Sequence, residues 1–122
     1  MKNLPSLLLL LGYLVACTSE QKTDINTENL VGRWQLKQAF RNEQPIETMS
    51  DLYFSFTTEG NMETNMPTGE GAATYSVSGD KIEQRNDQSQ LEYRIEELTE
   101  TTLILNTQVE NFRFRFAMEK TE

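Results

Sequence analysis

From Asn29 onward, apolar and polar residues alternate with a period of two rather than the 3.6 of a helix. A period of two places every second side chain on the same face of a strand. The first strand is expected to bury the row Gly32, Trp34, Leu36, Gln38 and Phe40. The last strand is expected to bury the row Phe112, Phe114, Phe116 and Met118. We therefore expect strands that each have one buried face.

The alternation predicts eight short strands, and residues 42–50 form a connection with room for one helical turn. The expected strands are residues 32–41, 52–57, 62–65, 73–78, 82–84, 91–96, 103–105 and 112–119. Short strands separated by turn residues are typical of antiparallel sandwiches and barrels. A closed barrel removes the exposed edges of an open sheet, and its interior needs roughly 24 inward side chains at about three per strand. The inward rows nearly supply this number, so we predict an all-β fold, an antiparallel up-and-down eight-stranded β-barrel.

The first residues have a different pattern. A short basic start is followed by an apolar run from Leu4 to Ala16. This run is shorter than the roughly 20 residues that a membrane-spanning helix needs. Its length and flanks are those of a secretory signal peptide, which is left out of fold reasoning.

The run ends in Leu14-Val15-Ala16-Cys17, which resembles a bacterial lipobox and contains the chain's single cysteine. The resemblance implies cleavage before Cys17 and its lipidation, with palmitate as one acyl chain. Two or more acyl chains give stable membrane anchoring. Thr18 is not aspartate, which by the common sorting rule implies the outer membrane of a Gram-negative envelope. The alternative is an ordinary signal peptide with a chance cysteine.

The segment after the cysteine is polar and has no apolar period. Its eleven residues up to Glu28 would span about 18 Å as a flexible coil. The sequence thus predicts three parts: a signal peptide (1–16), a lipidated cysteine with a tether (17–28) and a barrel domain (29–122).

The composition excludes several classes of function. The chain has no histidine and one cysteine, so histidine-dependent triads, histidine-ligated zinc and an internal disulfide are excluded. Its net charge of −8 argues against nucleic-acid binding, which depends on Lys and Arg. The acids Glu96, Glu97 and Glu100 match no calcium loop, so they are expected to be a solvated surface. We expect neither an enzyme nor a bound cofactor or metal.

Gly32-Arg33-Trp34, preceded by Asn29-Leu30-Val31, resembles the Gly-x-Trp sequence that opens the lipocalin barrel. Residues 95–105 are similar to the late hairpin of small bacterial lipocalin-like lipoproteins. The resemblance covers residues 28–120 and implies a binding module. It further implies that Gly32 and Trp34 form the barrel floor, with Arg113 or Arg115 stacked on the indole.

The candidate ligand-pocket residues are Gln38, Phe54, Tyr75, Tyr93 and Phe114. Each has an alternative role in the core. The phenylalanines would fill the interior, and the three polar side chains would form hydrogen bonds with other groups of the protein. An eight-stranded barrel is just wide enough for its own side chains. We therefore expect a mostly filled interior with a small pocket near the open end.

Two functional hypotheses remain open. In the first, the anchored barrel binds a small hydrophobic ligand. In the second, it is an interaction module or inhibitor that recognises another envelope protein through its loops. The loop from Met62 to Gly71 fits either hypothesis, as a methionine-bearing lip over the pocket or as a plain surface loop.

Overall fold

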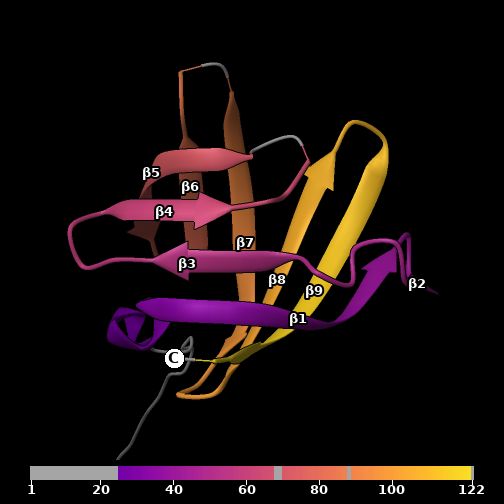
Figure 1. Ribbon diagram of the computed structural model, residues 1–122, viewed down its shortest axis with the longest axis horizontal. Helices are drawn as coiled ribbons and strands as arrows, with labels where there is room; N and C mark the ends of the chain where they lie inside the picture. Colours follow the sequence, from indigo (N-terminus) through magenta and orange to yellow (C-terminus); the bar gives the residue numbers. More distant parts are fainter. Residues whose placement is uncertain (1–24, 68–69, 88, 122) are drawn as a thin grey trace, which may run out of the picture.

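A computed structural model describes residues 25–67, 70–87 and 89–121 of the chain; the predicted signal peptide and Cys17 lie outside these ranges. Within these ranges, one 3-10 helix, η1 (Thr27–Leu30), precedes nine strands (Figure 1). The strands are β1 (Gly32–Arg41), β2 (Gln44–Ile46), β3 (Tyr53–Phe56), β4 (Asn61–Thr64), β5 (Gly71–Ser78), β6 (Lys81–Arg85), β7 (Gln90–Leu98), β8 (Thr102–Val109) and β9 (Phe112–Lys120). In the described segments, no helix is long and apolar enough to span a bilayer.

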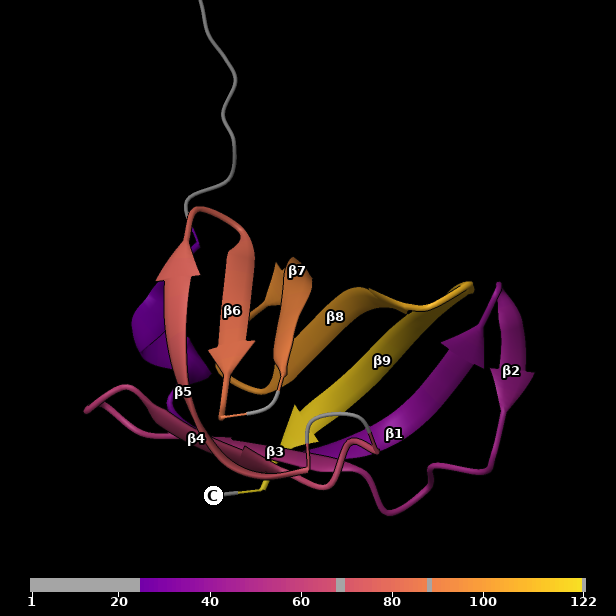
Figure 2. The ribbon, with the colours of Figure 1, turned by 90° about the horizontal axis from the view of Figure 1, so that it is seen from above.

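The strands form one antiparallel sheet in the order β2-β1-β3-β4-β5-β6-β7-β8-β9, and β1 also pairs with β9. This last pairing closes β1 and β3 to β9 into an eight-stranded barrel, and Figure 2 shows the strands curving around its interior. The predicted fold class is confirmed. The strand that the sequence pattern missed, β2, pairs only with the end of β1. Together with the end of β1, it forms a short hairpin that is not part of the closed wall.

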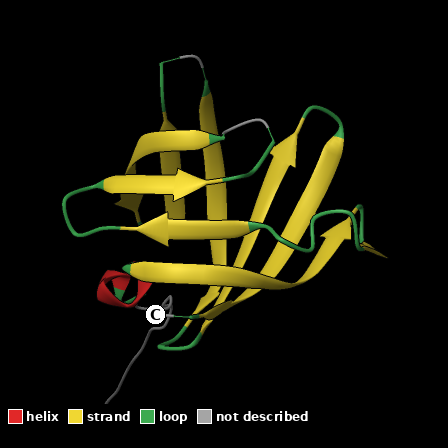
Figure 3. Cartoon of the chain, in the orientation of Figure 1, coloured by secondary structure: helices red, strands yellow, loops and turns green. Residues whose placement is uncertain are grey.

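The 3-10 helix η1, the short helical turn in Figure 3, lies at the end of the barrel where β1 begins. Leu30 of this turn is buried, and its carbonyl accepts a hydrogen bond of 2.9 Å from the indole Nε1 of Trp34. The helical turn spans the boundary that the sequence predicted between tether and barrel. We call this the closed end, and the end where β1 finishes the open end.

Much of the interior is filled by buried side chains. Trp34 and Phe116 are both fully buried, so they face the same core. Phe54 lies edge-on to Tyr93 with ring centroids 5.4 Å apart, a favourable aromatic geometry. The other buried apolar residues are Leu30, Leu36, Ala39, Leu52, Phe56, Met62, Met66, Ile82, Ile95, Leu103, Leu105 and Met118. Met62 and Met66 thus belong to the core, and neither methionine serves as an exposed lip.

A register shift in β1 corrects the predicted inward row. Leu36 lies opposite Met118 and Ala39 opposite Phe116, with the shift between Leu36 and Gln38. A β-bulge of this kind adds one residue to one strand and changes which side chains face inward beyond it. The prediction that Gln38 faces inward is wrong: its side chain is exposed, and its amide donates to the carbonyl of Ala39.

Candidate ligand-binding site

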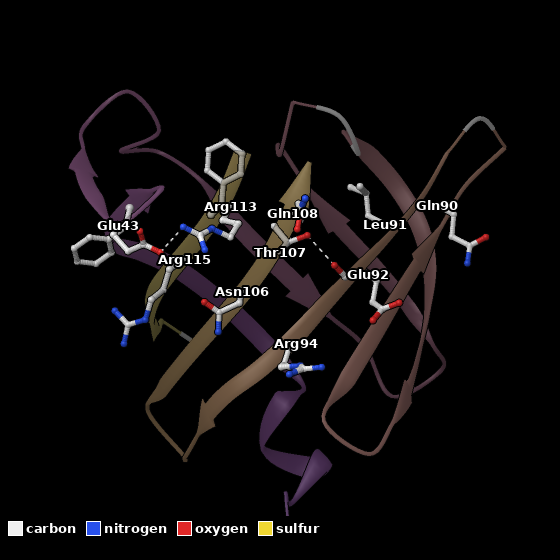
Figure 4. Close-up of a pocket in the computed structure, with 12 residues that line it drawn as sticks. Glu43, Gln90, Leu91, Glu92, Arg94, Asn106, Thr107, Gln108, Arg113 and Arg115 are labelled. Carbon is white, nitrogen blue, oxygen red and sulfur yellow. Dashed lines mark hydrogen bonds and ion pairs between the residues drawn. The ribbon is translucent and has the colours of Figure 1, made fainter. Parts of the chain in front are cut away.

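A pocket of about 810 Å³ lies at the open end, where β7 and β8 separate (Figure 4). Its lining residues come from β1 and the turn after it, β7, β8 and β9. They are Phe40, Glu43, Gln90, Leu91, Glu92, Arg94, Asn106, Thr107, Gln108, Arg113, Phe114 and Arg115. The volume lies in the range of sites that hold drug-sized molecules.

The pocket exists because β7 and β8 stop pairing before either strand ends. Their last paired residues toward the open end are Tyr93 and Thr107. Beyond this point, β7 pairs only with β6, and β8 pairs only with β9. The hydroxyl of Thr107 donates to the carbonyl of Glu92 over 2.7 Å and bridges the strands where they part, as Figure 4 shows.

Both faces of the sheet contribute to the pocket wall. Thr107 lies opposite both buried Tyr93 and Phe114, so it belongs to the inner face, as does Phe114. Phe114 stacks on Phe116 with centroids 5.8 Å apart and planes inclined by 20°. Because Phe116 is fully buried, Phe114 makes the apolar wall continuous with the core.

The outer part of the pocket is polar and charged. Arg113 forms an ion pair of 2.7 Å with Glu43, and both side chains are more than half exposed. Arg115 donates two hydrogen bonds of 2.9 and 3.0 Å to the carboxylate of Glu96. Hydrogen bonds from Arg115, then from Asn106, lower the pKa of Glu96, and the same contact raises the pKa of Arg115. The contacts of Glu96 connect β7 with β8 and β9, and the Arg113–Glu43 pair connects β9 with the turn after β1.

Of the five predicted pocket residues, only Phe114 lines this pocket. Phe54 is fully buried in the core below it. Tyr93 is fully buried as well, and its hydroxyl donates to Oε1 of Gln84 over 2.5 Å. Burial raises the pKa of this phenol well above its ordinary value.

Tyr75 is half-buried, and its hydroxyl donates to the carbonyl of Thr57 over 2.6 Å. Its pKa is raised by burial, and to a smaller extent by the negative charge of Glu59. The hydroxyls of both tyrosines thus form hydrogen bonds within the protein, which was one of the two alternatives open from the sequence.

The predicted stacking of Arg113 or Arg115 on Trp34 is wrong. Both arginines lie toward the open end of β9, where the first pairs with Gln108 and the second with Phe40. The cation over the indole is Lys120, whose Nζ lies 5.0 Å from the ring centroid. The same Nζ donates to the carbonyl of Asn29 over 2.9 Å and so ties β9 to the start of the domain.

Gly32 and Trp34 lie at the closed end, where β1 begins. Gly32 has φ of +134°, a backbone conformation that favours glycine because a Cβ would be strained there. This sharp change of direction leads the chain from η1 into β1 and places Trp34 over the closed end.

Sequence reasoning missed most of the lining residues, above all Leu91, Glu92 and Gln108. One signal was present: the inward row of β8 is apolar at Leu103 and Leu105 and becomes polar at Thr107. A polar inner residue indicates that the packed core ends there. Among the residues that the structure describes, no cluster of three or more acidic or sulfur side chains could hold a metal ion.

The comparisons agree with this architecture. Residues 30–105 match the lipocalin-like domain family, so the chain belongs to that family. The fold is similar to that of a lipocalin-like protein from Bacteroides uniformis, with a TM-score of 0.57 and 19% identity over 76% of this chain and 99% of that one. It is also similar to an uncharacterized protein from Bacteroides eggerthii, with a TM-score of 0.53 and 16% identity over 75% and 98% of the two chains. Among curated proteins, none matches the chain significantly.

Proposed function

We propose that this protein is a lipid-anchored lipocalin-like lipoprotein of a Gram-negative cell envelope, and that its barrel binds a small hydrophobic ligand at the open end. The observation that carries the proposal is the 810 Å³ pocket beside Phe114. The rest of the interior is filled by fully buried side chains such as Trp34 and Phe54. In this pocket a ligand would bind between the apolar wall and the charged rim. The proposed role is binding without catalysis.

Binding is tested with the neutral fluorescent probe N-phenyl-1-naphthylamine and two matched variants on β9. Phe114→Ala removes a ring from the pocket wall and is expected to weaken probe binding about tenfold, in line with the apolar area lost. Phe112→Ala removes an identical ring that does not line the pocket, and binding should remain near that of the wild type. A wild-type protein that binds no probe would refute ligand binding, as would equal losses in the two variants.

The natural ligand is sought by native mass spectrometry of the full protein purified from its own cell envelope. Ligand binding predicts a reproducible additional mass that dissociates as a small molecule. Phe114→Ala should reduce the fraction of protein that carries this mass. A wild-type protein that is free of added mass in every preparation would oppose the proposal.

Anchoring rests on Leu14-Val15-Ala16-Cys17, in which the single cysteine follows an apolar run. Cells grown with a labelled fatty acid should label the wild-type protein, and Cys17→Ser should abolish the label. The same substitution should move the protein from the membrane fraction to the soluble fraction. Equal labelling of the two proteins would exclude lipidation at Cys17.

A second candidate function is recognition of an envelope protein. Phe112 at the tip of the β8–β9 hairpin is 40% exposed, and among the described residues it is the one large hydrophobic side chain with such exposure. A partner that binds this tip should be lost with Phe112→Ala and retained with Phe114→Ala. The two functions thus predict opposite responses in the same pair of variants.

A further inference from the structure

We propose that the ligand of the open-end pocket is an amphiphile with an anionic head group, and that Arg41 holds this head group at the mouth. This inference rests on the proposed function, since it names the chemical class of the ligand that the same pocket takes. It depends on where the β-bulge in β1 places one arginine.

The bulge turns Arg41 toward the inside of the barrel. In strict alternation with Trp34 and Leu36, Arg41 would face solvent on the outer wall. After the register shift, Arg41 lies opposite Phe114, and opposite residues of an antiparallel pair share one face. Arg41 is exposed and is not itself a lining residue, but it lies next to Phe114, which lines the pocket, and therefore stands beside the pocket on the same face.

Arg41 carries a charge that no carboxylate neutralises. Six ion pairs occur among the described residues, and Arg41 takes part in none of them. Its guanidinium instead lies over the ring of Phe112, 5.2 Å from the centroid. A guanidinium stacked on an aromatic face is held in position, while its N–H groups remain free to donate to an anion. Although the chain has 19 acids against 11 bases, this arginine beside the pocket has no acidic partner among the described residues and can bind an anion.

A second positive charge lies close by. The backbone N–H of Asn42, next to Arg41, donates to the backbone carbonyl of Arg113 over 2.7 Å. This hydrogen bond joins the end of β1 to the start of β9 at the open end. The side chain of Arg113 lines the pocket and pairs with Glu43 in an exposed contact. Exposed pairs of this kind contribute little stability, so Arg113 can turn toward a bound anion at small cost.

Apolar surface begins directly below these charges. Phe114 and Leu91 line the pocket, and Phe116 beneath Phe114 is fully buried. A neutral hydrocarbon would leave the guanidinium of Arg41 unused. A molecule with an apolar tail and a carboxylate or phosphate head would contact both surfaces, because guanidinium binds these anions through paired hydrogen bonds.

The test is displacement of N-phenyl-1-naphthylamine from the full-length protein by dodecanoate, dodecyl phosphate and dodecanol, which share one alkyl chain. We expect at least one anionic compound to bind about tenfold or more tightly than dodecanol, as charge-assisted hydrogen bonds imply. The preferred anion identifies the head group. Arg41→Gln should remove this preference and leave dodecanol binding unchanged, and Arg41→Lys should retain part of it.

The matched control is Arg33→Gln. Arg33 also stacks on an aromatic ring, that of Tyr53 at 4.0 Å, and it also lacks an ion pair among the described residues, but it lies at the closed end. This variant should keep the wild-type preference. Equal binding of all three compounds to the wild type, or an unchanged preference in Arg41→Gln, would overturn the inference and leave hydrophobic ligand binding standing. A wild type that does not bind the probe would instead refute the proposed function itself.

Discussion

At the scale of single residues, Trp34 has the largest structural role at the closed end. Its ring is fully buried, its Nε1 donates to the carbonyl of Leu30, and the amine of Lys120 lies over its face. One side chain thus connects the start of the domain to both the first and the last strand.

Replacing this residue should be costly. We expect Trp34→Ala to lower the free energy of unfolding by about 3–5 kcal/mol, the usual effect of truncating a large core aromatic. Urea unfolding followed by circular dichroism measures the change. Phe112→Ala, at an exposed position, should change it by about 0.5 kcal/mol or less. A small effect of Trp34→Ala would show that the indole is not an essential part of the floor.

Residue-level predictions from the sequence succeeded where the alternation is unbroken and failed beyond the bulge. Trp34 and Phe114 were placed correctly on the inner face, whereas Gln38 was not. Both residues at the shift, Lys37 and Gln38, are polar and exposed, so the extra residue leaves no break in the hydrophobic pattern. The same shift makes Arg41 an inward residue, which a strict period of two excludes.

At the scale of elements, the carboxylate of Glu96 connects three strands. It lies on β7 and accepts hydrogen bonds from Asn106 on β8 and Arg115 on β9. Because these bonds favour the charged carboxylate, its pKa is lower in the folded protein than in the unfolded chain. The resulting stabilisation is present above the unfolded pKa and is lost as the pH falls through the folded pKa.

We therefore expect Glu96→Gln to lower the urea midpoint at pH 7, and this difference from the wild type to shrink as the pH falls below the ordinary pKa of a glutamate. High salt should also reduce the difference, because the pair is partly exposed. Glu100→Gln is the control, since Glu100 lies in an exposed turn and in none of the ion pairs of the described residues. A deficit in Glu96→Gln that persisted undiminished in acid would contradict this role.

The elements of the barrel wall were predictable because each has a buried face and is bounded by turn residues. Outside the wall, the sequence did not predict β2, because Pro45 and the lack of an alternating row hide three residues that pair only with β1. Proline is tolerated at such a sheet edge, where no ladder hydrogen bond from its nitrogen is needed. The strand forms because Asn42 and Glu43, both with positive φ, turn the chain back on β1.

At the scale of the whole molecule, closure of the barrel could be inferred from the number of inward side chains, but the position of the pocket could not. The pocket results from the early end of pairing between β7 and β8, at Tyr93 and Thr107. How far two neighbouring strands stay paired depends on the coiling of the complete sheet. The polar residue Thr107 marks where the apolar inner row of β8 ends, but it does not specify how far β8 stays paired with β7.

The helical turn η1 determines how an anchored molecule would stand. The chain enters the barrel through this turn, and β1 then runs from the closed end to the open end, a rise of about 30 Å for its ten residues. If the chain is anchored at Cys17 as proposed, the short tether holds the closed end near the lipid, and the open end faces the aqueous space. We expect a donor dye at position 100 to transfer more energy to a lipid-headgroup acceptor than the same dye at position 111. A ligand would then bind and dissociate on the aqueous side, and the barrel would not have to leave the membrane or tilt.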